Sequence, residues 1–309
     1  MVITAAPVSE ERGPVSTRFG PTRFGLARLR PVLGFLIILL LLVGLWEGYK
    51  LLGAVTGGKV PFTDATLPVR TDDRSMPHVT QIIASLFEPT RRGGEEALGI
   101  FLLRSSWVTF REALVGFCAG ALIGFGLGVL FVRSTLAERG LMPWVVASQT
   151  VPLLAIAPMV VLWAGKARLP LWVAVAAIAA FLSFFPVTIN TVRGLRSPAP
   201  TATELFRSYA STPRQEFVKL RVPAALPYLF TGLKVAAGAS VVGTIVGELP
   251  SGLPDGLGRQ LLTFAYYYLS GPEKLYAAVL FSALLGIVFV TLVALVERLV
   301  IPRSRRMPA

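Results

Sequence analysis

The sequence is poor in the residues that build disulfides, metal centres and active sites. It has one cysteine, Cys118, and one histidine, His78, among 309 residues. One cysteine cannot close an intrachain disulfide, and the pair is too few for a Cys/His metal cluster. An enzyme also needs converging acid, base or metal groups, and no such cluster is present. We therefore expect no catalytic residue, no metal site and no cofactor held by this chain.

Charged residues are scarce as well. They make up 15% of the chain, whereas about a quarter is usual in soluble domains. Hydrophobic residues make up 54%, so lipid is expected to be the main solvent. The net charge is +13, but Lys and Arg lie between apolar runs rather than in one cluster. This pattern argues against nucleic acid as a partner and favours a basic membrane protein.

Six apolar segments are long enough to cross a bilayer. A spanning helix needs about 20 mostly apolar residues, since each adds about 1.5 Å across a hydrocarbon core of about 30 Å. The segments are 32–54, 107–132, 141–164, 169–192, 227–249 and 275–296. The first is too long for a signal peptide and lacks a convincing cleavage site, so we expect it to be retained. The sequence predicts an all-α, multi-pass membrane protein with six transmembrane helices.

The distribution of Lys and Arg predicts that both termini are cytoplasmic, because the segments then placed inside hold more of them than those outside. The outer segments would be 55–106, 165–168 and 250–274. The predicted organisation is a basic tail (1–31), a first helix (32–54), a periplasmic segment (55–106), a five-helix core (107–300) and a tail (301–309). Within the periplasmic segment, residues 79–87 are expected to form a short surface helix.

Small residues recur at helical spacing in two of the apolar segments. The second segment has a glycine every four residues, and the fifth has Ala239, Gly243 and Gly247. The glycines of the second segment are Gly116, Gly120, Gly124 and Gly128. Because small residues on one helix face let another helix approach closely, we interpret both patterns as tight helix contacts.

A few polar side chains at membrane depth are candidates for a solute pathway. Gln149 and Thr150 precede Pro152, which frees backbone carbonyls that need partners. For Gln149, bonding between helices is as compatible with the sequence as contact with solute. Asn190 lies close to the cytoplasmic end of its helix, where capping or anchoring that end is favoured over a role as a gate. Ser240 and Thr244 are further candidates for the pathway, only because they are polar and lie at membrane depth.

Glu248 is the acidic residue near one end of the fifth apolar segment. A buried, unpaired charge there would be costly. We therefore expect Glu248 at the outer rim of the membrane rather than at an intramembrane proton site.

The segment 193–226 lies between two spanning helices and is polar. It predicts a short helix over 202–209 and a second over 214–222 that ends at Pro223. The sequence from Glu204 to Pro227 resembles the EAA loop of ABC-importer permeases, in which Glu-Ala-Ala is followed by a glycine and a Leu-Pro ending. Glu204, Pro223 and the final Ala-Ala-Leu-Pro fit this pattern. Leu205 and Phe206 replace the two alanines, and Ala210 replaces the glycine.

The resemblance covers roughly residues 36–300 and is strongest to the nitrate/sulfonate/taurine-type branch. It is carried by Leu45-Trp46-Glu47, Leu114 to Phe117, Leu162 to Gly165, Phe184-Phe185-Pro186 and Gly256-Leu257-Gly258. It implies a type I ABC-importer permease (MetI-like) core in a bacterial inner membrane. It also implies ABC ATPase subunits that bind ATP, a periplasmic substrate-binding protein at 165–168 and 250–274, and a second permease copy, identical or not.

The resemblance further implies which residues couple to the ATPase and what is transported. The coupling residues would be Glu204, Arg207, Ala210 and Pro223. The solute would be a nitrogen heterocycle, such as a pyrimidine precursor or riboflavin, or an anion of the sulfonate, taurine or nitrate type.

Two other interpretations fit less well. Gly53 to Lys59 has the spacing of a phosphate-binding loop, but Val60 stands where Ser or Thr is needed, and the segment follows an apolar helix. The main alternative is an ion-coupled secondary transporter. Such proteins usually carry acids or histidines at mid-membrane, or inverted repeats, and the sequence shows neither.

Overall fold

A computed structural model describes residues 26–60, 65–90 and 95–301. These residues form helices and no β-sheet; the β pairing among them is limited to two isolated bridges, Lys59 with Thr66 and Pro89 with Ala97. The predicted all-α fold is therefore confirmed. Of the two predicted tails, residues 1–25 and 302–309 lie outside the described residues.

The chain divides into two compact units, one up to Leu67 and one from Pro68. The first contains α1 (Leu26–Thr56), which begins before the predicted start at residue 32. The segment with phosphate-loop spacing is the end of this helix. It closes with Gly57 and Gly58, whose φ angles are 62° and 80°, and the Gly58 N–H donates to the Gly53 carbonyl at 2.9 Å. Its glycines thus end one helix, whereas a phosphate loop begins one.

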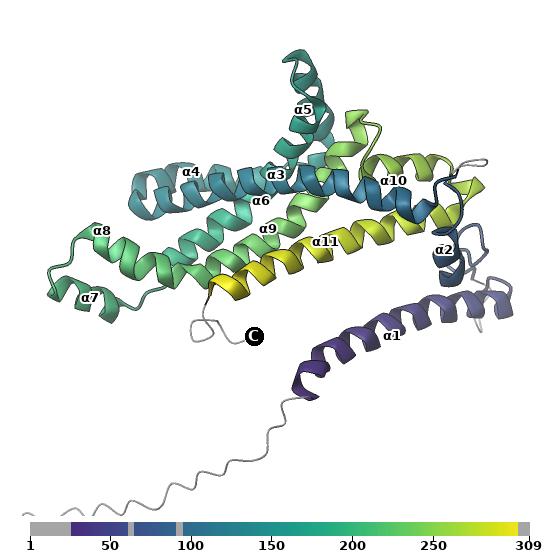
Figure 1. Ribbon diagram of the computed structural model, residues 1–309, viewed down its shortest axis with the longest axis horizontal. Coiled ribbons are helices and arrows are strands. Elements are labelled where there is room, and N and C mark those ends of the chain that lie inside the picture. The colour runs from purple at the N-terminus through teal and green to yellow at the C-terminus, as the bar shows by residue number, and fades with distance from the viewer. Residues whose placement is uncertain (1–25, 61–64, 91–94, 302–309) are drawn as a thin grey trace, which may run out of the picture. The chain divides into compact units, whose positions relative to one another are not determined.

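Four long helices form the body of the second unit (Figure 1). They are α3 (Leu98–Arg133), α6 (Leu171–Leu195), α9 (Val222–Ser251) and α11 (Pro272–Val300). Together with α1 they are the five helices in the described part of the chain that are long and apolar enough to cross a membrane. A bent pair of helices makes a sixth span if it is counted as one.

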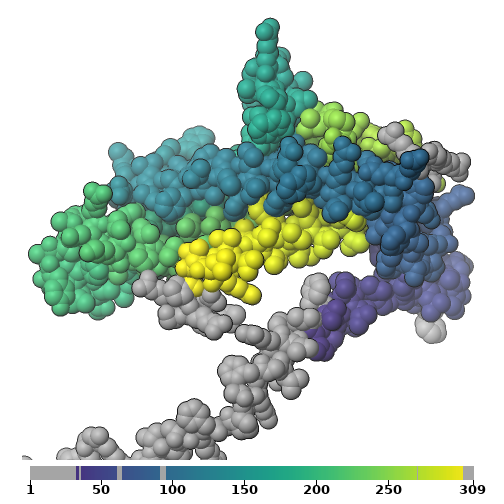
Figure 2. Space-filling view, in the orientation of Figure 1, coloured from purple at the N-terminus to yellow at the C-terminus, as the bar shows by residue number. Residues whose placement is uncertain are grey.

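The bent pair covers the predicted span 141–164, and the distortion expected at Pro152 is a sharp bend. It consists of α4 (Thr135–Ala147), the 3-10 turn η1 (Ser148–Thr150) and α5 (Leu153–Lys166), with a bend of 101°. Pro152 has no N–H to donate and favours an extended residue before it, and Val151 has φ −74° and ψ 126°. As a result α5 projects away from the bundle (Figures 1 and 2).

Helix α6 is the central helix of the bundle because glycines on both neighbours let it approach closely. A Cβ on Gly116 would lie 2.4 Å from Ala179 Cβ, and one on Gly124 would lie 2.4 Å from the Phe184 carbonyl oxygen. On the other side, a Cβ on Gly243 would lie 2.9 Å from Ala179 Cα. The interpretation of these glycines as tight helix contacts is confirmed.

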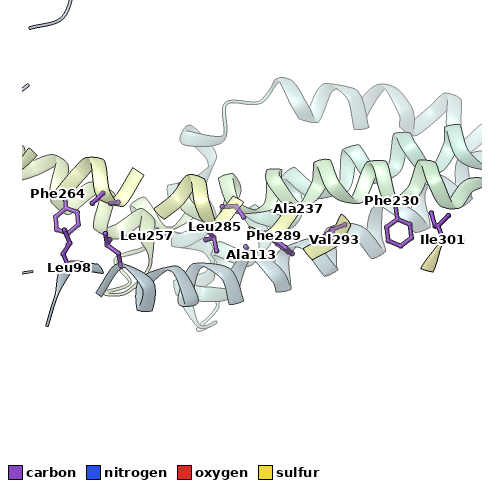
Figure 3. Packing of buried hydrophobic residues seen from close by; sticks show 14 residues of the cluster. Leu98, Ala113, Phe230, Ala237, Leu257, Phe264, Leu285, Phe289, Val293 and Ile301 are labelled. Carbon is purple, nitrogen blue, oxygen red and sulfur yellow. The ribbon is translucent and has the colours of Figure 1, made fainter. Parts of the chain in front are cut away.

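Apolar side chains fill the seam between α3, α9, α10 and α11. The buried cluster extends from Leu98, Leu257 and Phe264 at one end to Phe230 and Ile301 at the other (Figure 3). The outer surfaces of the same helices are also apolar, with Leu122 74% exposed, as expected where lipid replaces water. Cys118 is exposed on α3.

At one end of the bundle lie α2 (Val79–Ser85), α10 (Leu257–Tyr266) and the turn η3 (Tyr268–Ser270) (Figure 1). The hydroxyls of Tyr268 and Tyr276 donate to the Ser75 carbonyl at 2.7 and 2.9 Å. Burial, and secondarily the hydrogen bond with Tyr276, raise the pKa of Tyr268 to about 12. The Tyr268 hydroxyl therefore stays a donor at neutral pH and ties the segment before α2 to the start of α11.

Candidate functional site

The candidate coupling loop begins with an exposed helix. Helix α7 (Pro200–Ser208) starts with proline, which fits the first helical position because the N–H there has no helical partner. It has no buried residue: Glu204 and Arg207 are exposed, and so are Leu205 at 55% and the following Tyr209 at 79%. Apolar side chains beside charges on an unpacked helix form a surface that a partner protein can cover.

The turn after α7 explains why the EAA pattern has glycine at the position that Ala210 occupies in this chain. Ala210 has a left-handed backbone, with φ 51°. The Ala210 N–H donates to the Arg207 carbonyl at 2.9 Å, and the Ser211 N–H donates to the Phe206 carbonyl at 3.2 Å. This is a Schellman-type helix end, which favours glycine because a Cβ in the left-handed region costs roughly 1–2 kcal/mol.

Replacing Ala210 by glycine should stabilise this turn. Relief of the left-handed strain is worth about 1 kcal/mol, so amide exchange at residues 210 and 211 should slow by roughly fivefold. Hydrogen exchange of the purified protein measures this effect. Ala202→Gly, in the first turn of α7, is the matched control and should speed exchange, because glycine costs up to about 1 kcal/mol relative to alanine in a helix. Equal or faster exchange in Ala210→Gly would contradict the assigned strain.

The second half of the loop is continuous with a spanning helix. Thr212 caps α8 (Pro213–Glu216): its backbone N–H donates to Gln215 Oε1 at 2.8 Å, and its hydroxyl accepts from the Gln215 N–H at 3.3 Å. A π-helical turn, η2 (Phe217–Arg221), then leads directly into α9.

The predicted helix end at Pro223 is therefore wrong. Pro223 occupies the first turn of α9, directly after the π-helical turn. In a π turn the hydrogen bonds run between residues five apart, so the register shifts at the point where proline has no N–H to give. Helix α8 continues through the π-helical turn into α9 without a break, and α9 packs against α6.

Other contacts attach this loop to the ends of neighbouring helices. The Arg133 guanidinium at the end of α3 lies 4.8 Å from the centre of the Phe217 ring. Arg196, just after α6, donates to both carboxylate oxygens of Glu138 in α4 at 2.9 and 2.6 Å. The loop thus lies at the end of the bundle opposite α10, among the ends of α3, α4 and α6 (Figure 1).

The predicted pathway residues are not brought together in one place. Gln149 and Thr150 are exposed at the bend between α4 and α5, and Thr150 donates to the Ala147 carbonyl at 2.8 Å. Asn190 is half-buried and donates to the Pro186 carbonyl at 2.8 Å. Ser240 and Thr244 are fully buried in α9, and their hydroxyls bond to carbonyls of their own helix.

Glu248 is not at an exposed rim, which corrects the sequence-based expectation. It is completely buried, and its oxygens accept hydrogen bonds from the Thr109 hydroxyl at 2.7 Å and the Gly258 N–H at 2.6 Å. Thr109 in turn accepts from the Leu257 N–H at 2.8 Å. A Cβ on Gly256 or Gly258 would come within 3 Å of the Glu248 side chain. Glu248 therefore anchors the first turn of α10, whose free N–H groups favour a carboxylate.

Sequence reasoning missed Glu112. This residue of α3 is 7% exposed, and its Oε2 atom has no hydrogen-bond partner among the described residues. The signal that could have revealed it is its spacing, because Glu112 lies four residues before Gly116, on the face of α3 that packs against α6.

Comparison with known proteins gives a family match over most of the bundle. Residues 116–306 match the family described as "Binding-protein-dependent transport system inner membrane component". A formylaminopyrimidine transport permease protein of Halalkalibacterium halodurans is 36% identical over 62% of this chain and 74% of its own length. A riboflavin transport system permease protein of Chloroflexus aurantiacus is 29% identical over 92% and 96%. A putative aliphatic sulfonates transport permease protein of Bacillus subtilis is 31% identical over 62% and 67%.

A solved structure supports the fold. The crystal structure of an amino acid ABC transporter with histidines aligns with a TM-score of 0.51 at 17% sequence identity. The alignment covers 65% of this chain and 95% of the other. At this identity the likeness extends to the arrangement of helices alone.

Proposed function

Because the chain belongs to the family of binding-protein-dependent transport system inner membrane components, we propose that it forms the solute pathway of an ABC importer and is driven by an ATPase through the loop 193–226. The protein is a multi-pass permease of the bacterial inner membrane and not an enzyme. ATP hydrolysis belongs to a partner subunit, and no cofactor is assigned to this chain.

The observation that carries this proposal is the continuity of the loop with the bundle. Helix α7 presents an unpacked surface, and α8 runs through the π-helical turn into α9. A partner that grips Glu204, Arg207 and Ala210 would move α9, and with it α6, as a rigid body. Pro223 lies at the joint between loop and spanning helix, in the first turn of α9.

A second permease copy, identical or not, would complete the pathway. The projecting α5 exposes Leu154, Met159, Leu162 and Trp163, each more than half exposed, and this apolar surface suits a second chain or lipid. We assign Gln149, Thr150 and Asn190 to the pathway surface, with Ser240 and Thr244 in the packed helix behind it.

A periplasmic substrate-binding protein would dock at the opposite end of the bundle, on 165–168 and 250–274, with both termini cytoplasmic. The exposed Lys166 and Arg168 beside Leu169 provide charged and apolar contacts there. The solute belongs to one of two classes, either nitrogen heterocycles or small anions. The relatives named for formylaminopyrimidine and riboflavin favour the first class, and the relative named for aliphatic sulfonates favours the second.

Uptake into proteoliposomes tests this function. The permease, reconstituted with its partner ATPase and binding protein, should accumulate solute only with ATP and all three components present. The ATPase-free vesicle with an imposed proton or sodium gradient is the control. Uptake in that control, at a rate equal to that of the full complex, would identify a secondary transporter instead.

A further inference from the structure

A cavity of about 320 Å³ lies where the first half of α3 meets the start of α6 and the turn after α9. Its walls are Val108, Arg111, Glu112 and Val115 of α3, Trp172 of α6, and Leu253, Pro254 and Asp255 of the turn. This volume is at the lower end of the range for small-molecule sites, about 300–1,000 Å³. Neither the predicted pathway residues nor the coupling loop contributes to it.

The Glu112 carboxyl group is the unusual feature of this cavity. Its side chain is more than nine-tenths buried, yet Oε2 has no partner among the described residues. A buried carboxylate oxygen without a hydrogen bond costs more than the 1–3 kcal/mol typical of a neutral group. Oε2 itself is enclosed by protein, so a ligand in the cavity would donate to the other oxygen of the carboxyl group, Oε1.

The opposite wall of the cavity is held rigidly by the network around Glu248. The Ser251 hydroxyl donates to the Glu248 carbonyl at 2.9 Å and accepts from the Leu253 N–H at 3.2 Å. The Gln260 amide donates to the Pro254 carbonyl at 3.2 Å. Because these bonds fix the turn, little ordering is needed when a ligand binds.

We propose that this cavity binds a planar nitrogen heterocycle of pyrimidine size, whose ring or amino N–H donates to Glu112 and whose face lies against Trp172. This assignment rests on the proposed transport function and narrows its solute class to heterocycles. It adds Glu112 and Trp172 as residues that select the solute.

The charges of the cavity exclude the competing class. Glu112 and Asp255 supply two acidic groups against one guanidinium from Arg111, so a sulfonate or nitrate would meet one group of opposite charge and two that do not favour it. A carboxylate also accepts hydrogen bonds without donating any, which suits N–H groups and rejects oxyanions. Trp172, 44% exposed, provides an aromatic face that a planar ring can stack on and that a small anion does not use.

Fluorescence of Trp172 tests the site without any need for transport. In the purified full-length permease, Trp46, Trp107, Trp144 and Trp163 are replaced by phenylalanine, so that Trp172 is the reporter. A 4-aminopyrimidine is the ligand, and taurine and choline are the comparison solutes. We expect saturable quenching by the aminopyrimidine, and Glu112→Gln should weaken its binding by roughly tenfold or more, as expected for a hydrogen bond to a charged group. Glu95→Gln, which removes an exposed carboxylate, should leave binding unchanged.

The outcomes separate this site from the transport function. Quenching that is lost in Glu112→Gln supports the site even when ATP-dependent uptake fails. Unchanged binding in Glu112→Gln, or no saturable binding of the aminopyrimidine, overturns the site even when uptake succeeds. Taurine or choline binding as tightly as the aminopyrimidine overturns the assignment to heterocycles.

Discussion

Replacing Glu204 by arginine is expected to abolish ATP-dependent uptake while the protein still inserts in the membrane. Glu204 is exposed on α7, one turn before Arg207, and nothing in α7 is buried, so the substitution should not disturb folding. A partner ATPase matched to a carboxylate would instead meet two arginines on one turn. Loss of a desolvated charge contact costs roughly 2–5 kcal/mol, enough to weaken docking by about 30-fold to several thousand-fold.

Co-purification of the ATPase with tagged permease, followed by uptake into proteoliposomes, measures this loss. Glu95→Arg is the matched control, because it reverses an exposed carboxylate in the segment assigned to the other side of the membrane. It should recover the ATPase in full. If Glu204→Arg also recovers the complex and transports at the normal rate, Glu204 has no part in coupling.

The long helices could be predicted from hydropathy because a run of apolar residues marks the part of a helix that lies in lipid. The boundaries were less accurate. Helix α3 begins at Leu98 rather than residue 107, because Arg104 interrupts the apolar run without interrupting the helix. Hydropathy detects where a helix crosses the membrane, and the helix itself continues through charged residues wherever its backbone hydrogen bonds continue.

The sequence could indicate where the chain bends or where two elements join, but not the angle of the bend or the structure of the junction. Pro152 indicated a distortion, but no local pattern in the sequence specifies that the bend between α4 and α5 is 101°. At Pro223 the rule that proline ends a helix failed because a π-helical turn precedes it. Such a turn has no sequence signature of its own.

The burial of the acidic side chains Glu112 and Glu248 could not be predicted without knowledge of the fold. Glu248 depends on Thr109, a residue 139 positions earlier in the chain, so its partner could not be read from its own helix. The expectation of a solvated rim followed from the cost of an unpaired buried charge. That reasoning holds, but the structure resolves the cost with hydrogen bonds from Thr109 and Gly258 rather than with water.

The second large effect is expected at Gly124, where alanine should destabilise the bundle. Its added Cβ would lie 2.4 Å from the Phe184 carbonyl oxygen and 2.9 Å from Val187 Cβ. A backbone oxygen cannot rotate away, so α3 and α6 must separate, and overpacking of this kind typically costs about 1–3 kcal/mol. Thermal unfolding of the purified protein in detergent measures the loss.

Gly126 provides the matched control two residues along the same helix. A Cβ there meets nothing within 4 Å, and alanine is preferred over glycine in a helix by up to about 1 kcal/mol. Gly126→Ala should therefore leave the unfolding temperature unchanged or raise it. Equal unfolding temperatures for the two variants would show that α3 and α6 are not in close contact.

The same substitution also bears on how movement reaches the solute pathway. Helix α6 is held between glycines of α3 and α9, and α9 continues from the loop that we assign to the ATPase. If the three helices move together, a Gly124→Ala protein that still folds at low temperature should transport more slowly, because α3, pushed away from α6, follows the movement of α6 and α9 less closely. The rate of solute uptake by this variant should then fall by a larger factor than the amount of folded protein recovered from the membrane.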